Sequence, residues 1–173
     1  MIRQGGLFIA CACVGLIAGA VAARLTGYAE PVLRPAFFIG VALGVVAMLG
    51  PGRRMSLGRP TRFQRWALWF GLGLEGLLFA VLPATLGRVD PGTYWLSVLI
   101  VVGVHFLPLG AAFGPLCAGL GMLCIGLAST GLMVRGVIGA ESVILVDGTL
   151  KVLVGGVMTM YPAVGSWRPN MPG

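Results

Sequence analysis

The sequence predicts an all-α integral membrane protein with about six transmembrane helices arranged as three antiparallel hairpins. Two features of composition predict this class: 58% of the residues are hydrophobic and only 10% are charged, whereas soluble domains carry about a quarter charged residues. The third feature is a series of apolar runs close to the roughly twenty residues that a helix needs to cross a bilayer. The longest stretch between runs, 51–65, is too short for a soluble core. Residues 1–173 are therefore expected to form a single transmembrane domain.

Each predicted span follows from an apolar run and the residues that bound it. The first ends in small residues that resemble a signal-peptide cleavage site, so removal of this segment is an alternative. The second is shortened by Arg34 and Pro35, and the sixth carries charges. Trp66, Tyr94 and Trp95 fall near predicted ends, as interfacial aromatic residues do. The predicted spans are 7–23, 32–49, 66–86, 94–113, 115–134 and 137–164.

The basic residues predict the orientation of the chain rather than a nucleic-acid partner. The net charge is +7, and only Lys151 among the 12 basic residues is a lysine; most arginines lie at the ends of apolar runs. Arginine-rich connectors resist translocation. We therefore expect a bacterial inner (plasma) membrane protein with both termini cytoplasmic. The connector that decides this contains Arg53, Arg54, Arg59, Arg62 and Arg65.

Glycine is abundant, with 29 residues, and often recurs at four-residue spacing. Examples are Gly15 with Gly19, Gly40 with Gly44 and Gly110 with Gly114. Such spacing lets helix backbones approach closely in a membrane.

Four ionisable side chains lie inside apolar runs: Glu75, His105, Asp147 and Lys151. Charged groups in hydrocarbon are costly, so such residues often mark a functional site. At a rise of about 1.5 Å per residue, Glu75 and His105 lie roughly 12–14 Å from the inner surface and Lys151 roughly 15 Å from it. Asp147 precedes Lys151 by one helical turn, a spacing at which the two can pair. The four side chains are therefore expected to form one cluster.

This cluster allows two interpretations. In the first, the chain is a small permease, and the four residues form its substrate or proton site. Glu75 and His105 would exchange protons, while Lys151 would hold a substrate anion or reset the carboxylate. Pro108 removes a backbone amide near His105 and predicts a helix kink. In the second, the chain is a non-transporting structural or accessory membrane protein whose buried charges only fix helix packing.

Other site chemistry is not indicated by the sequence. The serine nearest in sequence to the only histidine lies two helical turns away, and no residues have the spacing of zinc or paired haem ligands. We therefore expect no enzymatic activity, no metal and no cofactor. The expected partners are the lipid bilayer and further copies of the chain, because six short helices enclose little space; crosslinking in native membranes would test this. The substrate is not indicated.

One short stretch carries a resemblance. Val104-His105-Phe106-Leu107-Pro108-Leu109 lies in a predicted span of a small six-span protein. In that setting it resembles an uncharacterised family of small multispanning prokaryotic membrane proteins. The resemblance implies the membrane class and no particular activity.

Overall fold

The predicted spans are helices in the structure. The computed structural model describes residues 2–27, 29–50, 61–86, 90–134 and 137–161. Within these ranges, six helices are long and apolar enough to cross a membrane, which confirms the all-α membrane class. They are α1 (Ile2–Thr26), α2 (Ala29–Leu49), α4 (Arg62–Leu86), α5 (Pro91–Phe113), α6 (Pro115–Met133) and α7 (Ala140–Met160).

The helix ends differ from the predicted spans in two places. The prediction that Arg62 and Arg65 belong to the connector is wrong, since both lie in the first turn of α4. The other three connector arginines lie outside the described residues. α7 is shorter than predicted, because Gly139 before it has extended backbone and the chain leaves the helix at Tyr161. Pro162 follows Tyr161, and a residue before proline disfavours helical backbone.

Local side chains and one glycine set the ends of α4 and α5. Gln64 N donates to Thr61 Oγ1 at 3.2 Å, and Thr61 N donates to Gln64 Oε1 at 3.1 Å, which is the reciprocal bonding of a capping box. Asp90 Oδ1 accepts from Thr93 N at 3.0 Å and caps α5. α5 ends before Gly114, whose φ of 100° suits glycine because it has no side chain. α6 therefore begins one residue later.

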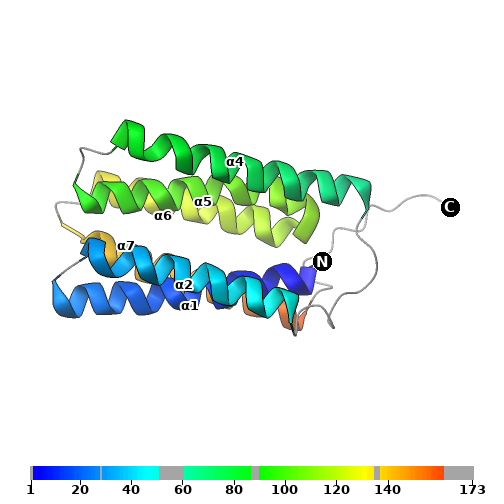
Figure 1. Ribbon diagram of the computed structural model, residues 1–173, viewed down its shortest axis with the longest axis horizontal. Helices are drawn as coiled ribbons and strands as arrows, with labels where there is room; N and C mark the ends of the chain where they lie inside the picture. Colours follow the sequence, from blue (N-terminus) through cyan, green and yellow to red (C-terminus); the bar gives the residue numbers. More distant parts are fainter. Residues whose placement is uncertain (1, 28, 51–60, 87–89, 135–136, 162–173) are drawn as a thin grey trace.

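The helices form two groups of three. α1 packs between α2 and α7, and α5 packs between α4 and α6. Consecutive helices run in opposite directions (Figure 1). The groups meet mainly where α7 contacts α6 and α5, while α2 and α4 lie at the outer edges and bury few residues. One cluster of buried apolar side chains, with members from all six helices, joins the two groups.

Glycines allow the closest helix contacts, as their spacing predicts. A Cβ placed on Gly15 of α1 would lie 2.5 Å from the Cα of Gly40 on α2. A Cβ on Gly155 of α7 would lie 2.6 Å from the carbonyl oxygen of Gly6 on α1. Side chains at these positions would force the helices apart. The backbone contact of α1 with both α2 and α7 therefore depends on glycine.

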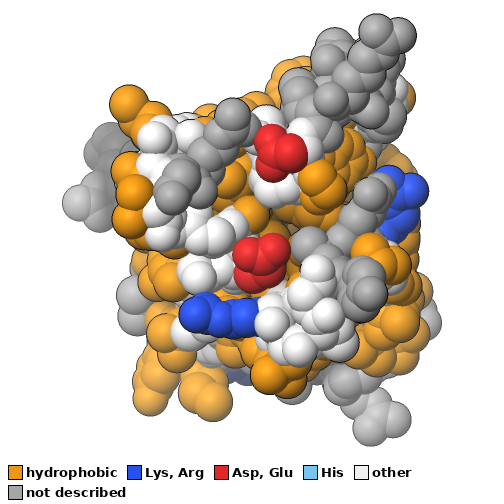
Figure 2. All heavy atoms as spheres, turned by 90° about the vertical axis from the view of Figure 1, so that its left-hand side faces the viewer, with side chains coloured by type: hydrophobic (Ala, Val, Ile, Leu, Met, Phe, Trp, Pro, Cys, Tyr) orange, Lys and Arg blue, Asp and Glu red, His pale blue; other side chains and the backbone are white. Residues whose placement is uncertain are grey.

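The end of the bundle where α1 stops and α2, α5 and α7 begin carries both acidic and basic side chains among hydrophobic and uncharged groups (Figure 2). Here Arg24 Nη1 at the end of α1 donates to Ser142 Oγ at the start of α7, at 3.1 Å. This bond holds together the two helices that the glycine contacts already bring close. Charged groups at helix ends can reach water beyond the hydrocarbon.

Candidate functional site

A cavity of about 580 Å³ lies between the two helix groups. Such a volume is within the usual range for small-molecule pockets. Its walls come from α1, α2, α4 and α5, and α7 contributes only Lys151. Most of the lining is aliphatic or aromatic, and the ionisable groups are Glu75, His105, Lys151 and the thiol of Cys13. A largely apolar space with a few convergent polar groups is the usual form of a ligand site.

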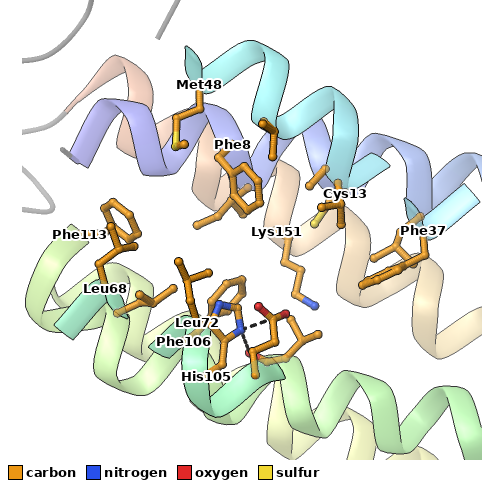
Figure 3. Close-up of a pocket in the computed structure, with 18 of the residues that line it drawn as sticks. Phe8, Cys13, Phe37, Met48, Leu68, Leu72, His105, Phe106, Phe113 and Lys151 are labelled. Carbon is orange, nitrogen blue, oxygen red and sulfur yellow. Dashed lines mark hydrogen bonds and ion pairs between the residues drawn. The ribbon is translucent and has the colours of Figure 1, made fainter. Parts of the chain in front are cut away.

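Glu75 and His105 face each other across the contact of α4 with α5. Glu75 Oε1 lies 3.6 Å from His105 Nδ1, and both line the cavity. His105 Nδ1 also lies 3.1 Å from the carbonyl oxygen of Val102. Because a carbonyl can only accept a hydrogen bond, this contact places a proton on Nδ1; when the imidazole is neutral, Nε2 is then its acceptor. Figure 3 shows both contacts as dashed lines.

Lys151 and Asp147 form a second pair on α7. Lys151 Nζ donates to Asp147 Oδ2, and each side chain is only 1% exposed. The ammonium also lies 5.8 Å from the centre of the Phe106 ring, close enough for a cation–π attraction. Asp147 Oδ1 has no hydrogen-bond partner among the described residues. The pair is thus enclosed and largely satisfied within the protein.

The structure places three of the four predicted site residues on one cavity and pairs the fourth with one of them. Glu75, His105 and Lys151 line it, whereas Asp147 does not. In Figure 3 the side chain of Lys151 extends across the space toward His105. Because Lys151 is paired with Asp147, an ionised Glu75 leaves one uncompensated negative charge whenever His105 is neutral. The expected role of Lys151 as the holder of a substrate anion stays a prediction.

The exposed part of the cavity wall lies on α2 and α4. Its lining residues on α1, such as Ile9 and Cys13, and on α5, such as Val102, are buried. By contrast, Val45 of α2 is 37% exposed and Leu72 of α4 is 44% exposed. α2 and α4 pack against α1 and α5 respectively rather than closely against each other. The gap between them faces the side of the bundle, where hydrocarbon would surround a membrane-spanning protein.

Pro108 lies one turn beyond His105, within α5. The helix continues through it from Pro91 to Phe113, although Pro108 has no amide hydrogen for the carbonyl of Val104. The predicted kink stays a prediction. No group of three potential metal ligands occurs in the part of the chain that the structure describes.

A family model described as a family of unknown function (DUF6609) matches residues 1–164. The chain belongs to this family. The matched range contains all six helices and every residue of the cluster. It agrees with the resemblance to an uncharacterised family that residues 104–109 suggested. No curated protein and no solved structure matches the chain.

Sequence reasoning missed most of the cavity wall. Phe8, Phe37 and Met48 line the space, but in the sequence they are ordinary members of apolar runs. Phe106 follows His105 directly and lies beneath the ammonium of Lys151, from a helix not adjacent in sequence. No local signal marks such residues, because an apolar side chain has the same pattern whether it faces lipid, a helix or a cavity.

Proposed function

We propose that the chain is a small permease of the bacterial inner membrane, with both termini in the cytoplasm, in which Glu75 and His105 change protonation during transport. The observation that carries this proposal is the cavity itself, since it holds a carboxylate, an imidazole and an ammonium partway along helices long enough to span a bilayer. Ionisable groups at such a depth usually line a substrate or proton pathway.

Transport requires the site to be reachable from each side in turn. The two helix groups meet through α7 and are separated by the cavity along α2 and α4. A rocking of one group against the other would open and close this space, as in transporters whose site lies between two bundles. The proposal gives the cluster no enzymatic role.

A structural or accessory role is the second candidate, and the pair of Lys151 and Asp147 favours it. Both side chains are almost fully buried and satisfy each other on one helix, so this pair by itself could serve only packing. The Glu75 side chain, which is 22% exposed and lines the cavity, is not explained in that way.

The test is transport by purified protein in liposomes under an imposed pH gradient. The vesicles are offered a mixture of small molecules, and the accumulated compounds are measured by mass spectrometry. For one-to-one proton exchange, a gradient of one pH unit should support accumulation of about tenfold. Glu75→Gln should abolish it, whereas Glu141→Gln, in the first turn of α7 and away from the cavity, should not. If no solute depends on Glu75, the permease proposal fails.

A further inference from the structure

We propose that the cavity binds a lipophilic monocation in exchange for one proton on Glu75, and that this ligand enters from the bilayer between α2 and α4. The inference rests on the proposed function and names its substrate class. Three observations carry it: the charge balance of the cavity, the apolar nature of its wall and the side on which it opens.

The net charge of the groups that line the cavity favours a cationic ligand. The titratable groups facing Glu75 are His105 on α5, Lys151 on α7 and the thiol of Cys13 on α1; α2 contributes only apolar side chains to the lining. Lys151 is paired with Asp147, and while the thiol is protonated and the imidazole is neutral, neither carries a charge. An ionised Glu75 then leaves a net charge of one negative unit in a low-dielectric space, which is costly. One proton, on Glu75 or on the neighbouring His105, or one monovalent cation cancels this charge, so proton and cation compete.

An anionic ligand would meet the opposite situation. It would add a second negative charge beside Glu75 unless two protons entered with it. The ammonium of Lys151 offers little help, because Asp147 holds it and Phe106 covers it. A neutral ligand would leave the carboxylate uncompensated unless a proton stayed on it. Of these ligands, only a cation can replace that proton without changing the pair on α7.

The apolar side chains that line the cavity favour a lipophilic ligand. Aromatic rings from three helices line it, namely Phe8 of α1, Phe37 of α2, and Phe106 and Phe113 of α5. Figure 3 shows Phe8 and Met48 on one side of the space and Leu72 with His105 on the other. Aromatic faces attract cations whose charge is spread over an apolar body. A strongly hydrated cation would lose its water without replacement.

The exposed side of the cavity, between α2 and α4, indicates the route by which a ligand would enter. Val45 and Leu72, which line the cavity from α2 and α4, are both partly exposed at the side of the bundle. A ligand dissolved in the bilayer would reach Glu75 by this gap without crossing a polar helix end. The gap needs no movement of the closely packed contact of α1 with α2, where Gly15 meets Gly40.

The test uses two probes of the same shape and opposite charge, tetraphenylphosphonium and tetraphenylborate, with the protein in lipid nanodiscs and empty nanodiscs as background. Tetraphenylphosphonium should bind and release one proton per cation. In the pH range where Glu75 of the free protein is protonated, its affinity should rise about tenfold per pH unit, because the bound cation replaces one proton. Glu75→Gln should lose the proton release, Glu75→Asp should keep it, and Glu141→Gln should behave as wild type.

The site proposal is overturned if tetraphenylborate binds as tightly as the cation, or if Glu75→Gln retains proton-linked binding. Folding of each variant is checked by its helical circular dichroism, and Glu75→Asp supplies the test if Glu75→Gln does not fold. Cation binding with proton release but without flux in liposomes would keep this inference and remove the permease proposal. Glu75-dependent flux of other solutes without cation binding would keep the permease proposal and remove this inference.

The route is tested by blocking the gap. Val45→Trp and Leu72→Trp should slow association of tetraphenylphosphonium severalfold. Val46→Trp and Leu77→Trp are matched controls, because these neighbours are 67% and 62% exposed but do not line the cavity. Equal association rates for lining and control variants would overturn entry from the bilayer.

Discussion

At the scale of single residues, Lys151 and Asp147 are the most enclosed charged side chains that the structure describes. The two residues are four apart on one helix, so the sequence alone could predict that they pair. The side chains that surround the pair come from other helices. Phe106 reaches Lys151 from α5, and the buried thiols of Cys13 on α1 and Cys124 on α6 lie near it. Three helices thus enclose a pair that a fourth supplies.

This enclosure predicts a strong dependence of Lys151 on Asp147. Asp147→Asn should destabilise the protein by about 3–5 kcal/mol, because it leaves a buried ammonium without its counter-charge. The double variant Asp147→Leu with Lys151→Met should be closer to wild type, since well-packed apolar groups often replace a buried ion pair at little cost. Unfolding in mild detergent, followed by circular dichroism, measures both. A double variant less stable than Asp147→Asn would contradict this account.

At the scale of helices, glycine contacts decide which pairs approach closely. α1 meets α2 at Gly15 and Gly40, and it meets α7 at Gly6 and Gly155. The four-residue glycine spacing predicted close packing of helices but not the partner of each face. α6, for example, packs more closely on α5 than on α7, its partner in the predicted third hairpin.

Gly15→Ala should therefore weaken the contact of α1 with α2. The new Cβ would lie 2.5 Å from Gly40 Cα and 2.8 Å from the carbonyl oxygen of Ala36, both backbone atoms that can move only with the helix. Overpacking of this kind typically costs about 1–3 kcal/mol. Gly73→Ala on α4 is the control, because nothing lies within 4 Å of its added Cβ. The midpoint of thermal unfolding in detergent should fall for Gly15→Ala only.

At the scale of the whole molecule, the residues that line the cavity all come from one chain. The expectation of a homo-oligomer arose from the small space that six short helices enclose, and it stays a prediction. The two helix groups place the starts of α1, α4 and α6 at one end of the bundle and the starts of α2, α5 and α7 at the other (Figure 1).

The arginine distribution predicts that the end containing the start of α4 is cytoplasmic. In a variant without the four native cysteines, Arg62→Cys should be protected from a membrane-impermeant thiol reagent added to intact cells, and Val137→Cys should be labelled. Both positions are exposed, Val137 at 89%. Permeabilised cells, in which both should react, provide the control. Labelling of Arg62→Cys in intact cells would reverse the orientation.

The sequence was sufficient to predict the spans, because a bilayer requires about twenty apolar residues in a row and this chain interrupts its runs with arginine, glycine and proline. The depth of Glu75, His105 and Lys151 followed from the same counting. The directions in which these three side chains face could not be predicted by counting. Each helix is apolar around almost its whole circumference, so the pattern does not distinguish a face that meets lipid from one that meets another helix. The packing of the helices against one another, at glycines for α1 with α2 and α7, fixes these rotations. With them it fixes the pairing of Glu75 with His105, the enclosure of Lys151 by Asp147 and the gap between α2 and α4.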